Sequence, residues 1–155
     1  MVNGYTGNIL RVDLTKEKIL IETPDELFYR RFIGGEGFVA YYLLKEVLAG
    51  IDPLSPDNKL IFATGPLTGF AIPGAGRNSV GAKSPLTGGF GEAEVGGHWG
   101  AELKHAGFDA IIVEGKAKKP VYLWIKDGIV EIKDASHLWG KVTGEAEAII
   151  KNELG

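Results

Sequence analysis

Apolar and polar residues alternate along two separate parts of the chain, one near each end. A period of two is typical of half-buried strands, and each alternating pair is interrupted by a short polar turn. The second turn is Asp127-Gly128, a dipeptide that favours tight hairpins. Two β-hairpins are therefore expected. Their strands are predicted at Asn8–Leu14, Lys18–Glu22, Val121–Lys126 and Ile129–Lys133.

Helix start and stop signals follow each hairpin. Thr23 as N-cap, Pro24 at the first helical position and Glu26 closing a capping box predict a helix that stops at Gly34-Gly35. A second helix, from Glu36 to about Ala49, is expected directly after it. The other predicted helices are Gly97–Ala106, Ala135–Trp139, and Thr143 to the end of the chain.

Apolar runs bounded by turn residues predict buried strands at Lys59–Thr64 and Asp109–Glu114, with a shorter strand at Val80–Lys83. The order hairpin, short helix, Gly-Glu, longer helix occurs twice, about 110 residues apart. We therefore predict an α+β fold of mixed β-sheets with packed helices, built from pseudo-duplicated hairpin-helix-helix-strand units. Because the second copy stops at Gly155, where its strand should begin, residues 1–155 are interpreted as an incomplete domain with a truncated second unit.

Composition narrows the class of protein. The chain is 45% hydrophobic and 24% charged, as in soluble globular proteins. Its net charge of −3, without a long basic run, argues against nucleic acid as a partner. Its longest apolar run is seven residues, Phe38–Leu44, far below the ~20 that cross a bilayer, so no membrane association is expected. No signal peptide is visible at the N-terminus, and we expect a cytoplasmic protein.

The sequence contains no cysteine. Disulfides, thiolate-bound iron–sulfur clusters and cysteine-ligated zinc are therefore excluded within these residues. Any metal must be held by oxygen or histidine nitrogen, or arrive inside a cofactor.

Glycines are concentrated between Thr64 and Gly107, which holds 12 of the 23 in the chain. This stretch contains Pro-Leu-Thr-Gly twice, at 66–69 and 85–88, with Arg77 between the copies. Glycine costs backbone entropy but lets the backbone approach a ligand closely. The stretch therefore indicates a cradle for a flat, anionic ligand.

Several motifs in and around the glycine-rich stretch carry a family resemblance. They are Ala63–Gly69, Gly74–Arg77, Lys83–Gly88 and Gly96–Lys104, with Asp52–Pro56 and Gly107–Ala117 in support. Together they resemble the N-terminal domain of the tungsten-containing aldehyde ferredoxin oxidoreductase family, over essentially the whole chain.

The resemblance implies a domain that seats a tungsten bis-molybdopterin cofactor, with a magnesium ion bridging the phosphates of the two pterins. It implies oxidation of an aldehyde to a carboxylic acid, with electrons passing through a 4Fe-4S cluster to ferredoxin. Arg77 matches the family's pterin-contacting arginine, and Gly96 matches a backbone contact to the cofactor, with Gly97 beside it. A guanidinium can bind phosphate bidentately, and Gly N–H groups at a helix start favour an anion.

The position at which the family offers an asparagine to the magnesium matches Glu94, which makes Glu94 the candidate metal ligand. The family's cluster cysteines, second pterin region and substrate residues all lie downstream of Gly155. The resemblance therefore assigns no catalytic residue to this chain, and we expect the fragment to be inactive alone. Exposed apolar surface where the missing half unit belongs would favour a homo-oligomer.

Other interpretations stay open at this point. The alternative to an enzyme is a non-catalytic binding module or subunit that holds an anionic ligand or docks on a partner chain. A dinucleotide binder is disfavoured, because no Gly-x-Gly-x-x-Gly follows a strand and opens a helix. His98 and Lys83 are each open between a cofactor contact and a structural or exposed role, whereas His105 and His137 are interpreted as structural.

Overall fold

A computed structural model describes residues 4–155 of the chain, with four helices and eight strands in that range. The strands are β1 (Ile9–Asp13), β2 (Lys18–Glu22), β3 (Lys59–Thr64), β4 (Asn78–Lys83), β5 (Phe90–Val95), β6 (Ala110–Glu114), β7 (Val121–Lys126) and β8 (Ile129–Asp134). The helices are α1 (Glu26–Phe32), α2 (Glu36–Glu46), α3 (Trp99–His105) and α4 (Thr143–Leu154). The predicted α+β class is confirmed.

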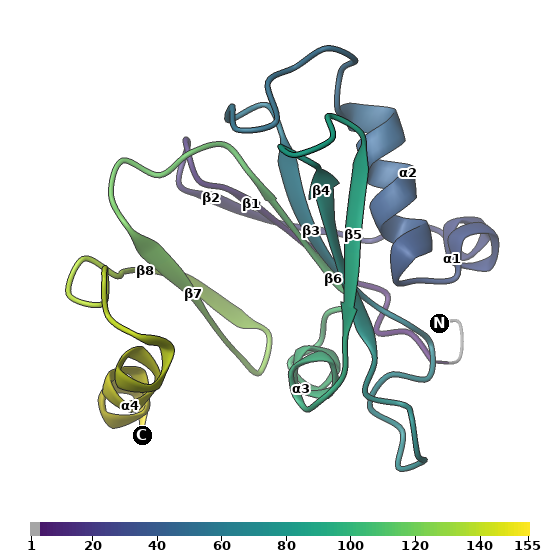
Figure 1. Ribbon diagram of the computed structural model, residues 1–155. Coiled ribbons are helices and arrows are strands. Elements are labelled where there is room, and N and C mark those ends of the chain that lie inside the picture. The colour runs from purple at the N-terminus through teal and green to yellow at the C-terminus, as the bar shows by residue number, and fades with distance from the viewer. Residues whose placement is uncertain (1–3) are drawn as a thin grey trace.

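Six strands form one mixed sheet in the order β2-β1-β6-β3-β4-β5 (Figure 1). β1 and β6 pair in parallel, with Ile9 opposite Ala110, although about a hundred residues separate them. All other neighbours in the sheet are antiparallel. The second hairpin, β7–β8, stands apart as a two-stranded sheet. Both predicted hairpins are confirmed, but only the first joins the large sheet.

α1 and α2 cover one face of the six-stranded sheet (Figure 1). Their aromatic side chains pack on alternate residues of the central strands, among them Ile61 and Ile112. Phe28 and Phe38 are at the centre of this core, with ring centroids 4.8 Å apart. The N-cap of α1 is Asp25, whose carboxylate accepts the N–H of Phe28 at 2.9 Å. The predicted cap at Thr23 was therefore wrong.

α3 and the β7–β8 hairpin cover the opposite face (Figure 1). Leu10 and Ile111, which alternate with the residues facing α2, pack there against Leu103 of α3. Apolar side chains of β7 and β8, such as Leu123 and Ile132, complete this second core. The alternation of each central strand is thus used on both faces, because the sheet is covered on both sides.

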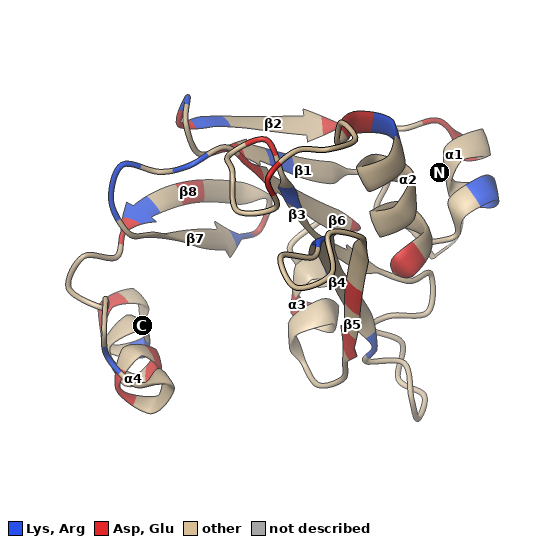
Figure 2. Ribbon diagram, turned by 45° about the horizontal axis from the view of Figure 1, so that its top comes forward, with Lys and Arg blue, Asp and Glu red and all other residues tan. Residues whose placement is uncertain are grey.

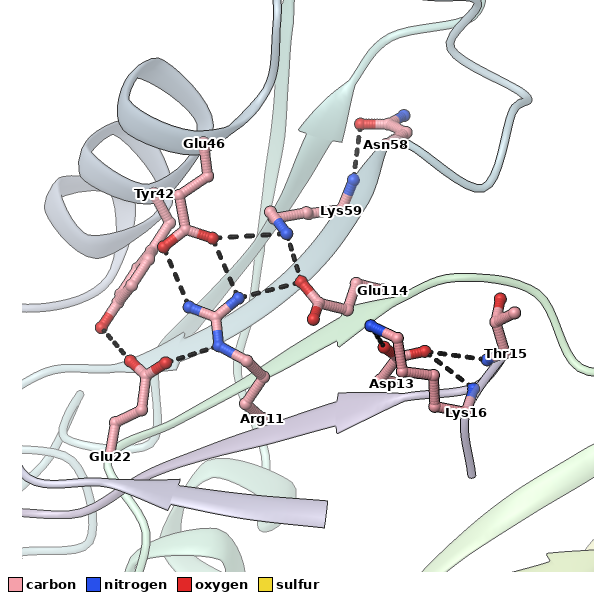
Figure 3. A network of polar contacts seen from close by, with 10 residues as sticks. All are labelled: Arg11, Asp13, Thr15, Lys16, Glu22, Tyr42, Glu46, Asn58, Lys59 and Glu114. Carbon is pink, nitrogen blue, oxygen red and sulfur yellow. Dashed lines mark hydrogen bonds and ion pairs between the residues drawn. The ribbon is translucent and has the colours of Figure 1, made fainter. Parts of the chain in front are cut away.

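A network of charged side chains joins the end of α2 to the sheet (Figure 3). Arg11 on β1 forms ion pairs with Glu22, Glu46 and Glu114, and its two contacts to Glu46 are each 2.9 Å long. Lys59 on β3 pairs with both Glu46 and Glu114. The network therefore ties one helix to four strands on the face that α2 covers.

The structure differs from the predictions in three further respects. β5 was not predicted, and its six residues form the outer edge of the sheet. The short helix expected at Ala135–Trp139 is instead a run of turns, in which the N–H of Leu138 donates to the carbonyl of Ala135 at 2.9 Å. Helices α2 and α3 are both shorter than predicted, since the turn residues that flank them stay outside the helical ladder.

α4 is the longest helix at 12 residues, and none of its residues is buried. Within residues 4–155, no helix combines the length and the apolar character that a bilayer span requires.

Candidate functional site

The loop between β3 and β4 folds back on itself and ends at Arg77, whose side chain is exposed directly before β4. The Thr68 hydroxyl donates to the carbonyl oxygen of Arg77 at 2.8 Å and accepts the N–H of Gly65 at 2.9 Å. A further bond runs from the N–H of Gly69 to the carbonyl of Ala75, also 2.9 Å. Because Thr68 is only 5% exposed, its two bonds are partly shielded from water and help to fix the backbone on which Arg77 stands.

The junction between β5 and α3 lies directly against this loop. A Cβ atom on Gly76 would lie 2.7 Å from the carbonyl oxygen of Gly97. Gly97 itself has a φ of +110°, which side chains rarely adopt. A Cβ on Gly96 or Gly97 would meet nothing within 4 Å. The two predicted glycines therefore present open backbone surface beside the Arg77 loop.

Arg77 and Glu94 come together across the last two strands of the sheet. Glu94 is opposite Ser79 in the β4–β5 ladder, so Arg77, two residues before Ser79, is its diagonal neighbour. The Arg77 Nη1 to Glu94 Oε2 distance is 3.5 Å, and the two side chains are 66% and 55% exposed. This is a weak, solvent-facing ion pair that leaves most of the guanidinium free.

A recess of about 310 Å³ contains both side chains. Its other wall is the turn between α1 and α2, where Gly34 packs so closely on β3 that a Cβ would lie 2.4 Å from the carbonyl of Thr64. Glu36, the first residue of α2, also lines the recess. Its charged lining is thus one arginine and two glutamates, and Figure 2 shows the acidic positions on β5 and at the start of α2 at the same end of the molecule.

Lys83 and His137 lie away from this region, whereas His98 directly follows Gly97. Lys83 lies at the far end of β4 and donates from Nζ to the carbonyl of Ile51 at 2.8 Å, which accounts for it without a phosphate. His137 pairs with Glu153 at 2.8 Å. His98 is the exposed residue before α3, and its side chain makes no capping bond to that helix.

Sequence reasoning missed the turn at Gly34-Gly35 as part of the site. The paired glycines were assigned only to a helix boundary, although the same signal fits a close backbone approach. It also missed Asn78, which lines the recess; its Oδ1 is buried against Gly100 of α3 and has no hydrogen-bond partner among the described residues. An orphaned buried acceptor is costly, and a bound water, ion or ligand is one way to satisfy it.

The described residues contain no group of three histidine or acidic side chains close enough to hold a metal. A cation at Glu94 would therefore need other ligands, such as phosphate oxygens. The fit for a phosphate-bearing pterin rests on two observations: the Arg77 guanidinium is largely free, and the side-chain-free backbone at Gly96 and Gly97 lies beside the loop that carries Arg77. A planar anionic group can lie on such a surface.

Comparisons with known proteins identify the family of the chain. Residues 9–155 match the family described as "Aldehyde ferredoxin oxidoreductase, N-terminal domain". The tungsten-containing aldehyde ferredoxin oxidoreductase of Pyrococcus abyssi is 57% identical over 98% of this chain and 25% of its own length. The "Aliphatic sulfonate oxidoreductase, WOR-like subunit" of Pyrococcus furiosus is 44% identical over 88% of this chain and 22% of its own length.

A solved structure also matches. It is the "Active site complex BamBC of Benzoyl Coenzyme A reductase in complex with 1,5 Dienoyl-CoA", with a TM-score of 0.96 and 44% identity over 99% of this chain and 24% of that one. The chain thus spans about a quarter of the length of the curated relatives it matches. Because the family match covers nearly all of the chain, this protein belongs to the aldehyde ferredoxin oxidoreductase family and corresponds to its N-terminal domain.

Proposed function

We propose that this chain is the cofactor-seating N-terminal portion of a tungsten-pterin oxidoreductase that converts an aldehyde to a carboxylic acid and passes electrons to ferredoxin. The observation that carries the proposal is Arg77, which stands exposed at the rim of a glycine-lined surface in a chain of this family. Tungsten-containing relatives that are 57% identical over 98% of the chain support the choice of metal.

Different residues of this chain would contact different parts of the cofactor. Arg77 would bind a phosphate of the pterin through its guanidinium, since that group offers paired N–H donors to an oxyanion. Gly96 and Gly97 would let the cofactor lie against the backbone. Glu94 would contribute a carboxylate oxygen to a magnesium ion bound with the cofactor.

When bound, the tungsten centre would supply the two-electron oxidation of the aldehyde. The chain itself contains no cysteine and so cannot hold the 4Fe-4S cluster through thiolates. The cluster would therefore belong to other parts of the protein, and we propose that the substrate pocket, the ferredoxin contact and the remaining cofactor ligands lie there as well. The same fold in a benzoyl-CoA reductase complex means that the fold alone does not select the substrate.

The proposal is tested by cofactor content. The polypeptide that contains these residues is produced with tungstate, and tungsten and pterin are measured per chain for wild type, Arg77→Ala and Arg77→Lys. We expect Arg77→Ala to lose most of both, and Arg77→Lys to retain an intermediate amount because lysine keeps the charge without the paired donors. Arg30→Ala, an exposed arginine on α1 paired with Glu26, is the matched control. Unchanged occupancy in Arg77→Ala would exclude the role given to this residue.

A further inference from the structure

Residues 4–7, which precede β1, contact two walls of the recess from outside it. One wall is the turn between α1 and α2, where the Tyr5 hydroxyl donates to the carbonyl of Ile33 at 2.6 Å. The other wall is the β3–β4 loop, against which Gly4 packs so closely that a Cβ would lie 2.7 Å from the carbonyl oxygen of Pro66. Ile33 and Pro66 both line the recess. The 4–7 segment therefore connects two walls that come from separate parts of the chain.

The carboxylate of Asp109 holds the 4–7 segment in place. It accepts the N–H of Thr6 at 3.0 Å and the N–H of Gly7 at 2.9 Å. The carbonyl oxygen of Asp109 accepts both the N–H and the hydroxyl of Thr64, at 2.9 and 2.8 Å. Because Thr64 is the last residue of β3, Asp109 fixes the segment relative to the start of the β3–β4 loop.

Lys104, in the last turn of α3, joins Asp109 to Gly4. Its Nζ donates to Asp109 Oδ1 at 2.8 Å and to the carbonyl oxygen of Gly4 at 2.6 Å. The side chain of Lys104 is 10% exposed and that of Asp109 is 1% exposed. A carboxylate at this depth depends on its cation, because an unpaired buried charge is strongly unfavourable. One ammonium group thus serves both the carboxylate that holds the segment and the residue that packs on Pro66.

We propose that Lys104 is a positioning residue for the recess: through Asp109 and Gly4 it holds the 4–7 segment against both walls and so sets their separation. Lys104 lies outside the lining of the recess and acts only through these contacts. Its consequence for the cofactor rests on the proposed function, in which Arg77 at the end of the β3–β4 loop binds a pterin phosphate.

Loss of different contacts should affect the two walls differently. Tyr5→Phe removes the bond to the α1–α2 turn and leaves Gly4 in place, so only the α1–α2 turn should loosen. Lys104→Met releases the Gly4 carbonyl and leaves Asp109 without its cation, so the turn and the β3–β4 loop should both loosen. A general loss of stability would not distinguish between the two walls.

Amide hydrogen exchange, followed by mass spectrometry, measures this in the polypeptide that contains these residues, produced without tungstate. The N–H of Gly35 reports the α1–α2 turn, since it donates to the carbonyl of Thr64 at 3.0 Å. The N–H of Gly69 reports the β3–β4 loop, and residues 38–43 of α2 report overall unfolding. Relative to α2, we expect exchange in each affected wall to rise about three- to tenfold, as the loss of one hydrogen bond allows.

Two variants separate positioning from lost stability. Arg11→Met breaks a different, largely buried set of ion pairs and should raise exchange in the walls no more than in α2. Lys104→Arg keeps the positive charge and should restore part of the protection that Lys104→Met loses. If Lys104→Met does not fold, Tyr5→Phe tests the same inference, because it leaves the buried pair intact. Walls that loosen no more in Lys104→Met than in Arg11→Met would overturn the inference, as would a Tyr5→Phe protein whose α1–α2 turn is as protected as in wild type.

Cofactor content gives the second measurement. In protein produced with tungstate, Lys104→Met and Tyr5→Phe should retain less tungsten and pterin than wild type, with Lys104→Arg between Lys104→Met and wild type. Loosened walls with undiminished cofactor would overturn the positioning role, whereas the proposed function is decided by Arg77→Ala. Because exchange is measured without the cofactor, failure of this inference can be told apart from failure of the proposed function.

Discussion

Gly76 and Gly97 face one another so closely that a Cβ on Gly76 would lie 2.7 Å from the carbonyl oxygen of Gly97. The neighbour is backbone rather than a flexible side chain, so it cannot rotate away. This contact joins the loop that carries Arg77 to the junction that carries Gly96. The spacing between the two parts of the candidate cofactor surface therefore depends on the absence of a side chain at residue 76.

We predict that Gly76→Ala destabilises the chain and separates these two parts of the surface. An added methyl group that meets fixed atoms typically costs about 1–3 kcal/mol in free energy of unfolding. Urea denaturation measures that cost, and cofactor content of the whole protein should fall with it.

Gly96→Ala is the matched control for this prediction. A Cβ there meets nothing within 4 Å, and the residue has an ordinary φ. Its free energy of unfolding should stay within about 0.5 kcal/mol of wild type. If Gly76→Ala proved as harmless as Gly96→Ala, the close approach would not constrain the site.

The elements that sequence analysis predicted correctly are those with local signals. The second hairpin is an example: Asp127 and Gly128 both have positive φ, at 50° and 81°, as the favoured two-residue turn requires. A turn of this kind is determined by the residues within it, so no distant contact is needed to predict it. The first hairpin and the start of α2 were predicted from similarly local patterns.

The Arg77–Glu94 pair could not be predicted, because it depends on a strand without a local signal. β5 has the sequence Phe-Gly-Glu-Ala-Glu-Val, and it lies at an edge where most of its side chains are exposed. Only its pairing with β4 makes it a strand, and that pairing sets Glu94 diagonal to Arg77. The family resemblance identified Arg77 and Glu94 as separate candidates. Their contact could be recognised only from the register of the β4–β5 pairing.

The charged network at the end of α2 gives a second prediction, on stability. Arg11 is 11% exposed and pairs with three carboxylates, so Arg11→Met would leave Glu22 without its cation and Glu46 and Glu114 with Lys59 alone (Figure 3). Removing one partner of a largely buried ion pair typically costs about 3 kcal/mol or more. We expect a loss of about 3 kcal/mol in the free energy of unfolding, measured in urea.

Two further variants make this test specific to the network. Arg30→Met removes an exposed pair with Glu26 on α1 and should cost about 0.5 kcal/mol at most. Adding Glu46→Gln to Arg11→Met should recover part of the loss, because one of the repelling charges is removed. An Arg11→Met protein as stable as Arg30→Met would mean that the network contributes little.

The same network predicts how stability responds to acid. Partial burial alone would raise the pKa of Glu46, but hydrogen bonds and charge from Arg11 and Lys59 outweigh burial and lower the pKa below its ordinary value of 4.5. A carboxyl whose pKa is lower in the folded state contributes stability that is fully present above the unfolded value. That contribution is lost as the pH falls below 4.5 and through the folded pKa.

Glu46→Gln should therefore lower stability at pH 7 and flatten its acid dependence. One fewer proton taken up on unfolding reduces the slope by up to about 1.4 kcal/mol per pH unit between the two pKa values. Urea unfolding at a series of pH values below 5 measures this slope. Glu145→Gln, an exposed carboxylate in the first turn of α4, is the control and should leave the slope unchanged. Equal acid slopes for Glu46→Gln and wild type would show that Arg11 and Lys59 do not hold Glu46 in its charged form.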